Sequence, residues 1–494
     1  MSRDALHRSW RSEKLFALLL TGLFAVLLFG TLRQHEPWRD EAQTWLIGRD
    51  ASLRETFELL RYQAHPALWY LMVRPLVRLD LPYSSMGLLH GLIAVANAFL
   101  VLRFAPLPRL TRALLVFSFW MFWMYAVESR VYAIGILLLF LIAWRYPERH
   151  ARPWLHGALV ALLFNSNLHM FFLAAALAAA FAWETLRGRR WDRGHVLSLG
   201  LMAAGALALA WQFDWFRPPA DNMHGGAYAW NSNSAVILRG IATAIFPGAG
   251  DTYAYWIPPA LALLLLCFYA LLTRPAPLGI LLVHVTGMSL LLWWTTAQLR
   301  HSGLFLLGAV FAMWISRDHG DSFVPRFLPE FGRRWTWAVV ALNVGLILSL
   351  HEGWKMHVMD RSMEYSGTRR MAEYIRLEGL AAHPVAAHRY AHLSAIAAYF
   401  PGKKFWYIGI GEWATYVRQD RRHQRAHALS HDEALRILAE QDLAREPLLL
   451  LTDVPFAVLP PGFRALHKVD DRVWRADEVC YLYFREPTPR GEGP

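Results

Sequence analysis

The sequence predicts a polytopic α-helical membrane protein with about 11 membrane spans and a small C-terminal α/β domain. Two observations carry this prediction. Apolar runs such as Leu15–Leu32 and Leu278–Ala297 recur along the first 350 residues, and each approaches the ~20 residues that cross a bilayer. After His351 these runs stop, and the mean hydropathy of the whole chain is only +0.24. With 55% hydrophobic and 18% charged residues among 494, the composition excludes a soluble enzyme and a disordered chain.

Arginines in short loops set the predicted orientation. Loops rich in arginine alternate with loops poor in arginine, and the rich ones mark the cytoplasmic side. This places the N-terminus in the cytoplasm and the C-terminal domain in the periplasm, with the chain in the inner membrane. The basic N-terminus and first apolar run lack a small-residue cleavage site, so we expect an uncleaved anchor. The spans are expected at 15–32, 84–103, 112–127, 132–144, 154–168, 170–184, 195–213, 256–273, 277–297, 302–316 and 335–350, with a loop at 214–255.

The first outer loop, residues 33–83, departs from the arginine rule because it holds seven arginines on the predicted outer side. Its apolar piece Ala67–Leu79 has 13 residues and two arginines, which is too short and too charged to cross. We therefore expect helices lying in the outer interface over 37–79. Arginines kept on an outer face indicate an anionic ligand there. The aromatic residues expected at headgroup level are Trp38, Trp45, Trp69 and Tyr70.

The tail, assigned to 351–494 and compact from about residue 358, is predicted to be an α/β domain. Ser430-His431-Asp432-Glu433 is typical of a capping box that opens a helix to about Gln441. Strands are expected over 404–410, 447–451 and 479–484, and helices near 366–379 and 391–400. Residues 487–494 are expected to be a frayed end.

The net charge of +12 does not indicate a nucleic-acid partner, because the basic residues are scattered between apolar segments. The two cysteines, Cys267 and Cys480, have no metal-type spacing, and a bridge between them is not expected.

Five polar motifs lie at predicted outer ends of the spans. Each has a structural explanation of its own: acidic residues suit a helix N-terminus, Pro66 suits a helix start, and Glu128 can pair with Arg130. Their common side of the membrane is the stronger argument for one site. The motifs are Trp38-Arg39-Asp40-Glu41-Ala42, His65-Pro66, Glu128-Ser129-Arg130-Val131-Tyr132, Asn165-Ser166-Asn167-Leu168-His169 and Gln298-Leu299-Arg300-His301.

A carboxylate beside arginines and histidines at headgroup depth fits transfer of a group from a lipid-linked phosphate. Neighbours on a helix are turned about 100° apart, so only one of Asp40 and Glu41 can face a given site. That residue would be the general base, and Arg130 and Arg300 would hold the phosphate, with His301 or His65 nearby. The chain carries no P-loop, H-E-x-x-H, G-x-S-x-G or dinucleotide fingerprint.

The order of these motifs over about residues 15–350 resembles the GT-C glycosyltransferases. It is most similar to bacterial members of glycosyltransferase family 39, the protein O-mannosyltransferase and aminoarabinose transferase type. The resemblance rests on Asp40-Glu41-Ala42, His65-Pro66 with Tyr70, Glu128-Ser129-Arg130-Val131-Tyr132-Ala133, His169 and Arg300-His301. It implies inverting transfer from a polyprenyl-phosphate sugar to an acceptor hydroxyl of a protein, lipid or glycan. By the same resemblance Asp40 carries the catalytic role and Glu41 supports it.

This chain departs from the family pattern at Ala64-His65-Pro66-Ala67, where many relatives have two prolines and often a preceding lysine. The donor sugar is therefore not predicted. Glu128, Tyr132 and His169 are expected to belong to the same site. Because a single phosphate can leave without a metal, no obligatory cofactor is expected, and a role for a divalent metal stays open.

Two other functions remain in view from the sequence. A transporter or flippase of a lipid-linked sugar would use the same arginines and need no base, although the inverted repeats and broken helices of many transporters are not evident. A non-catalytic assembly subunit would use the outer domain for docking.

Overall fold

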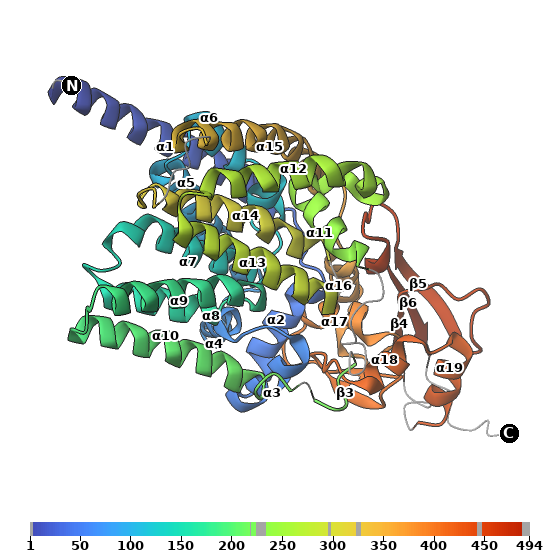
Figure 1. Cartoon of the computed structure of the whole chain (residues 1–494). Coiled ribbons are helices and arrows are strands. Elements are labelled where there is room, and N and C mark those ends of the chain that lie inside the picture. Colours follow the sequence, from blue (N-terminus) through green and yellow to red (C-terminus); the bar gives the residue numbers. More distant parts are fainter. Residues whose placement is uncertain are drawn as a thin grey trace.

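The computed structural model of the chain describes residues 3–217, 219–223, 234–294, 298–322, 328–441 and 447–486. Within these ranges eight helices are long and apolar enough to cross a membrane, which indicates a membrane protein. The helices form one end of the molecule and a small sheet domain forms the other (Figure 1). Between them lie α2 (Arg39–Asp50) and α3 (Leu53–Gln63), and α4 (Leu68–Arg78) packs on α2 and α5 (Ser84–Phe104). The eight long helices contain α1 (Arg3–Leu32), α5 (Ser84–Phe104), α9 (Phe171–Arg187), α10 (Arg193–Gln212), α12 (Tyr253–Leu271), α13 (Pro275–Trp294), α14 (Leu299–Ser316) and α15 (Phe331–Ser362).

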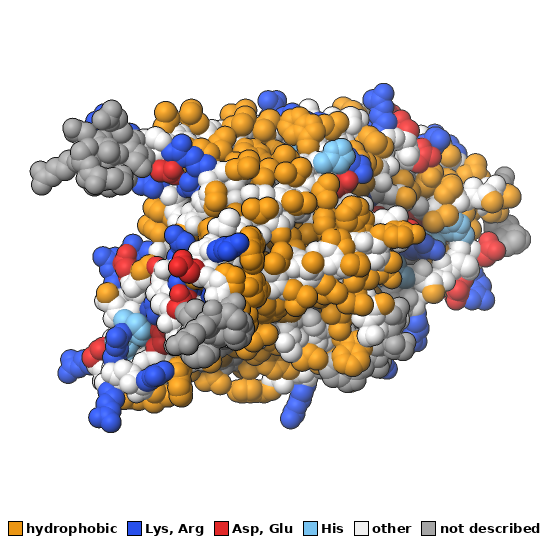
Figure 2. Space-filling model, turned by 45° about the horizontal axis from the view of Figure 1, so that its top comes forward, with side chains coloured by type: hydrophobic (Ala, Val, Ile, Leu, Met, Phe, Trp, Pro, Cys, Tyr) orange, Lys and Arg blue, Asp and Glu red, His pale blue; other side chains and the backbone are white. Residues whose placement is uncertain are grey.

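Large hydrophobic side chains of these helices face outward. Val26 is 72% exposed, Leu265 63% and Val344 57%. Hydrophobic side chains cover much of the middle of the molecule in Figure 2, and the charged side chains gather mostly towards its ends. In water such a surface would favour aggregation, whereas in lipid it is the expected surface of a helix bundle.

The predicted span at 112–127 is wrong as a single helix. It is broken into α6 (Arg109–Val116) and a short π-helix, η1 (Phe119–Met124), whose six residues are all buried. The break is held from a distant helix, because the Ser349 hydroxyl of α15 accepts a hydrogen bond from the Phe119 N–H at 3.1 Å. π-helical turns are rare and occur often beside functional sites, and this one leads directly into the loop that carries Arg130.

The loop predicted at 214–255 is also corrected in part. It contains α11 (Ala235–Ile245), which packs on α12 and α14 and buries Gly240 to Ile245, and the short helix η4 (Pro247–Thr252) follows it. With 11 residues, α11 is about 16 Å long, too short to cross a bilayer alone. The remaining helical segments are α7 (Tyr132–Arg145), η2 (Tyr146–Glu148), α8 (Pro153–Phe164) and η3 (Leu168–Met170).

The helices expected over 37–79 are present as α2, α3 and α4, and α4 has only 11 residues. The aromatic residues expected at headgroup level do not face lipid, since Trp38, Trp45, Trp69 and Tyr70 are at most 4% exposed. The reason is that this loop is covered from two sides. The Trp69 ring packs on His90 of α5, and Gln43 of α2 exchanges two hydrogen bonds with the backbone of Val417 in the sheet domain.

The C-terminal α/β domain is confirmed. Its six strands lie in the order β3-β2-β1-β4-β6-β5, in which β2, β1 and β4 are parallel and the other pairs are antiparallel. The strands are β1 (Val385–Ala387), β2 (Phe405–Tyr407), β3 (Glu412–Ala414), β4 (Leu448–Thr452), β5 (Phe463–Val469) and β6 (Cys480–Arg485). The helices are α16 (Thr368–Leu377), η5 (Leu380–Ala382), α17 (Tyr390–Ala397), α18 (Arg421–His427), α19 (His431–Ala439) and η7 (Ala476–Glu478).

The three predicted strands match β2, β4 and β6. Ser430 caps α19 by accepting from the Glu433 N–H, which is one half of the predicted capping box. The short strands β1 and β3 and the long edge strand β5 were not predicted. Helix α15 continues without a break through the predicted domain boundary at residue 350 and ends at Ser362. The expected frayed end at 487–494 and the end of the predicted span 277–297 lie outside the described residues.

Candidate active site

A cavity of about 640 Å³ lies where the helix bundle, the outer loop and the sheet domain meet. Six of the nine predicted site residues line it, although they stand up to 261 positions apart in the sequence (Asp40 to His301). The six are Asp40, His65, Arg130, His169, Arg300 and His301. Apolar side chains at the ends of α10 and α13 also line it, namely Phe213, Phe216, Leu291 and Trp294.

Asp40, in the first turn of α2, faces two guanidinium groups. Its carboxylate pairs with Arg130, and Arg300 Nη2 lies 3.6 Å from the same Oδ2 atom. Burial alone would raise the pKa of Asp40, but the positive charges of Arg130, Arg300 and Arg39 outweigh it and hold this pKa well below its ordinary value. Asp40 is therefore an ionised carboxylate between two arginines on a cavity wall.

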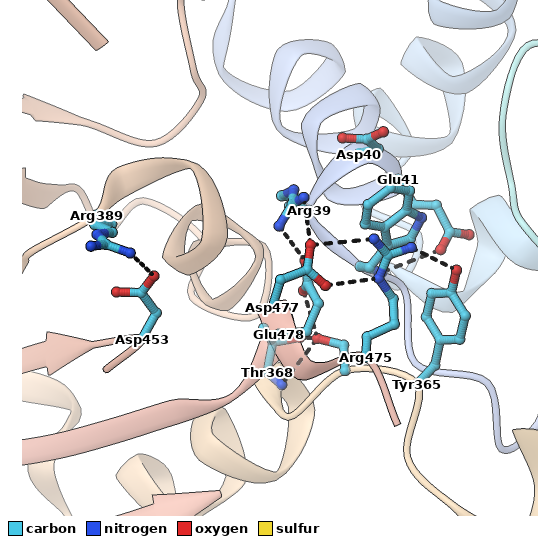
Figure 3. Close-up of polar contacts among 12 residues, drawn as sticks. Arg39, Asp40, Glu41, Tyr365, Thr368, Arg389, Asp453, Arg475, Asp477 and Glu478 are labelled. Atoms are coloured by element: carbon cyan, nitrogen blue, oxygen red, sulfur yellow. Dashed lines mark hydrogen bonds and ion pairs between the residues drawn. The ribbon is translucent and has the colours of Figure 1, made fainter. Parts of the chain in front are cut away.

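Glu41 does not line the cavity, and in Figure 3 its carboxylate points in another direction than that of Asp40. Its Oε1 accepts from the Ser129 N–H at 2.6 Å, and its Oε2 accepts from the Trp38 N–H at 3.2 Å. The same Oε2 lies 3.1 Å from His35 Nε2, and His35 Nδ1 lies 2.9 Å from Asp360 of α15. Glu41 thus caps its own helix and fixes the backbone next to Arg130. The periodicity argument, that only one of the two carboxylates can face the site, is confirmed.

The His35 imidazole, which links α15 to Glu41, is buried between two carboxylates. Burial lowers the pKa of His35, but Asp360 and Glu41 raise it by more, so the pKa stands well above its ordinary value. The imidazole is therefore charged at neutral pH and forms a buried ion triad with Glu41 and Asp360.

His65 orients Arg130. Arg130 Nη2 donates to His65 Nε2 at 3.0 Å, which makes Nε2 the acceptor and assigns the ring proton to Nδ1. Burial, together with the charges of Arg130 and Arg300, lowers the pKa of His65 well below its ordinary value. His65 is therefore neutral and keeps one N–H to donate.

His169 and His301 form the far side of the cluster. Their rings are 4.1 Å apart, and Tyr132 lies behind them, with its ring centroid 6.5 Å from His169 and 6.3 Å from His301. Tyr132 and Glu128 do not line the cavity. The carboxylate of Glu128 accepts from Tyr365 at 2.6 Å, and burial raises its pKa.

The arginine excess of the outer loop has mainly a structural explanation. Arg49 donates to the carbonyls of Ala397 and Ala398, Arg74 donates to the Ala51 carbonyl, and Arg54 pairs with Glu58. Among the seven arginines, Arg39 and Arg61 line the cavity. The excess therefore indicates an anionic ligand less directly than Arg130 and Arg300 do.

Sequence reasoning missed the sheet domain's share of the cavity. No local signal could have indicated it, because these residues stand more than 300 positions after Asp40 and follow no motif. They are Ser394, Val417, Gln419, His423, His427 and Arg475.

No protein-family model matches the chain, and no curated protein is significantly similar to it. In the described part of the chain, no group of three or more His, Cys, Asp or Glu side chains is arranged to hold a metal ion. The function is therefore argued from the geometry of the cavity.

Proposed function

We propose that this protein is an inverting membrane glycosyltransferase of the GT-C type, which moves a sugar from a polyprenyl-phosphate donor to an acceptor hydroxyl. One observation carries the proposal. A single carboxylate, Asp40, lies between two arginines at a cavity that large apolar side chains also line. A donor with an anionic phosphate and a hydrocarbon tail matches both kinds of lining.

The donor would use the polar and the apolar lining at once. Its phosphate binds Arg130 and Arg300, which offer planar forks of N–H donors suited to phosphate oxygens. Its isoprenoid tail lies against Phe213, Phe216 and the end of α13. The two arginines and Asp40 together carry one net positive charge, since His65 is neutral, and this charge favours an anionic ligand.

In the proposed reaction the acceptor oxygen attacks the anomeric carbon from the face opposite the phosphate. The bond from that carbon to the phosphate oxygen breaks, and its electron pair leaves with the polyprenyl phosphate. Asp40 receives the acceptor proton. The two arginines stabilise the charge that develops on the leaving phosphate.

The low pKa of Asp40 fits a base that becomes active only in the loaded site. While Arg130 and Arg300 face Asp40 alone, it is a weak base. A phosphate between the guanidinium groups takes up part of their positive charge and so makes Asp40 more basic. Donor binding would therefore precede deprotonation of the acceptor.

The transporter alternative has one observation in its favour, the interrupted segment formed by α6 and η1, because discontinuous helices are common in transporters. Mass spectrometry of envelope lipids, glycans and proteins, from cells with and without the gene, identifies the donor and product. Purified protein in liposomes should then release polyprenyl phosphate and form one glycosylated product per donor consumed. Passage of intact donor across the bilayer without cleavage would overturn the transferase in favour of the transporter.

We further propose that the cavity and the sheet domain are periplasmic. The support is the arginine distribution and the length of α4, whose 11 residues are too few to cross a bilayer. Single cysteines at Arg54, Arg78 and Val458 should react with a membrane-impermeant maleimide on intact spheroplasts, while one at Arg190 should not. All four positions are exposed, and the buried Cys267 and Cys480 are first replaced by serine. Opposite labelling of positions 54 and 78 would show that α4 crosses the membrane.

A further inference from the structure

One arginine of the sheet domain reaches both chain segments that carry the candidate site. Trp38 stands two residues before Asp40, and Glu128 stands two residues before Arg130. The guanidinium carbon of Arg475 lies 3.8 Å from the ring centroid of Trp38. Through Tyr365 it also reaches the second segment.

The second path consists of two hydrogen bonds. Arg475 Nη1 donates to the Tyr365 hydroxyl at 3.2 Å, and that hydroxyl donates to Glu128 Oε1 at 2.6 Å. The contact between Arg475 and Tyr365 is visible in Figure 3. Trp38, Tyr365 and Glu128 are all at most 6% exposed, so little solvent enters this path.

The Arg475 guanidinium is itself held in one orientation. Its Nε and Nη2 donate to the two carboxylate oxygens of Asp477 at 3.2 and 3.3 Å. Asp477 also pairs with Arg39 at 2.7 Å, the residue next to Asp40, and Glu478 accepts from the same Arg39 at 3.3 Å (Figure 3). One edge of the fork thus lies on Asp477, another N–H on Tyr365 and the flat face on Trp38. Lysine has a single point charge and cannot make these contacts together.

We propose that Arg475 is a positioning residue of the active site: through Trp38 and through Tyr365–Glu128 it sets the placement of Asp40 relative to Arg130. The inference rests on the proposed function. Arg475 also lines the cavity, but three of its five N–H groups are directed to Asp477 and Tyr365, so we assign it a role through these neighbouring side chains. The sheet domain is accordingly a part of the catalytic unit.

The test compares Arg475→Lys with Arg370→Lys in the full-length protein in nanodiscs. Arg370 is a matched control, since it also lies in the sheet domain, pairs with two carboxylates (Glu364 at 3.2 Å and Asp471 at 2.8 Å) and does not line the cavity. We expect Arg475→Lys to lower kcat by about 10²-fold, the size expected for a displacement of about 1 Å, and to weaken binding of polyprenyl phosphate. Arg370→Lys should change neither, and both variants should unfold at similar temperatures.

A third variant tests the path itself. Tyr365→Phe keeps the packing and removes the hydroxyl, so it should lower kcat less than Arg475→Lys does. The double variant should have nearly the same kcat as Arg475→Lys alone. Parent-like kcat and polyprenyl phosphate binding in Arg475→Lys would overturn the positioning role and leave the transferase intact. If the parent binds polyprenyl phosphate but transfers no sugar, the proposed function fails, and the loss of binding in Arg475→Lys still decides the positioning role. Equal losses of kcat and binding in Arg475→Lys and Arg370→Lys would show that Arg475 contributes only to the stability of the sheet domain.

Discussion

Two charged clusters lie on opposite sides of the start of α2, and the signs of their charges are arranged in opposite ways. On the cavity side one carboxylate, Asp40, faces the guanidinium groups of Arg130 and Arg300. On the other side one imidazole, His35, lies between the carboxylates of Glu41 and Asp360.

The difference between these clusters lies in what can replace their partners. The Asp40 side chain is 23% exposed and borders a cavity, so a ligand can compete for its arginines. The residues of the His35 cluster are at most 5% exposed, and nothing can enter. The two adjacent acids therefore have different roles. Glu41 holds the start of α2 in place, and Asp40 on the same helix turn has partners that a ligand can displace.

The largest expected effect is on the cavity side. Asp40→Asn should lower sugar transfer by ~10²–10⁴-fold, the usual cost of removing a positioned base. It should leave the fold intact and bind polyprenyl phosphate at least as tightly as the parent, because the carboxylate that competes for Arg130 and Arg300 is gone. Transfer rates and lipid binding in nanodiscs check both points. Turnover equal to that of the parent would show that Asp40 is not the base.

Replacement of the adjacent acid, Glu41, should affect stability more than activity. Glu41→Gln breaks a buried ion cluster, which typically costs about 3–5 kcal/mol, so the variant should unfold at a lower temperature and give less folded protein. The fraction that folds should retain measurable transfer. If Glu41→Gln matched the parent in thermal stability and yet had no activity, the two acids would share the chemistry and the contrast would be lost.

A smaller effect is expected from the arginines. Arg130→Ala and Arg300→Ala should each weaken donor binding by about 1.5–3 kcal/mol, which is about 10–150-fold, through loss of a charge-assisted hydrogen bond. Arg130 should matter more, since it also contacts His65. Arg54→Ala is the control, because this arginine is on the outer loop but 89% exposed. Unchanged donor binding in both variants would place the phosphate elsewhere.

The smallest effect is on pH dependence. Because folding raises the pKa of His35 above its ordinary value of about 6.5, the charged ring stabilises the protein fully below that pH, and this stabilisation is lost as pH rises through the raised pKa. The thermal midpoint of the parent should fall towards alkaline pH, while that of His35→Gln should change less. A constant difference between the two proteins across pH 6–10 would show that His35 is neutral.

Much of this architecture could be predicted because local sequence patterns determine it. Long apolar runs predict the helices, and the polar motifs at their ends predict that Asp40, Arg130 and Arg300 lie together. The break between α6 and η1 could not be predicted, because Phe119–Met124 is as apolar as a span and the hydrogen bond that holds it comes from Ser349, 230 residues away. Which of Asp40 and Glu41 faces the cavity also depends on distant partners, such as Asp360.

Helix α15 has 32 residues, so it is about 48 Å long against a hydrocarbon core of about 30 Å. Near its C-terminal end, Asp360 forms the triad with His35 and Glu41, so in the proposed topology this helix fixes the height of Asp40 relative to the bilayer. The depth of a lipid phosphate is set instead by the thickness of the membrane. The proposed reaction requires Asp40 and this phosphate to lie at the same depth. We therefore expect the rate of the proposed transfer to depend on membrane thickness.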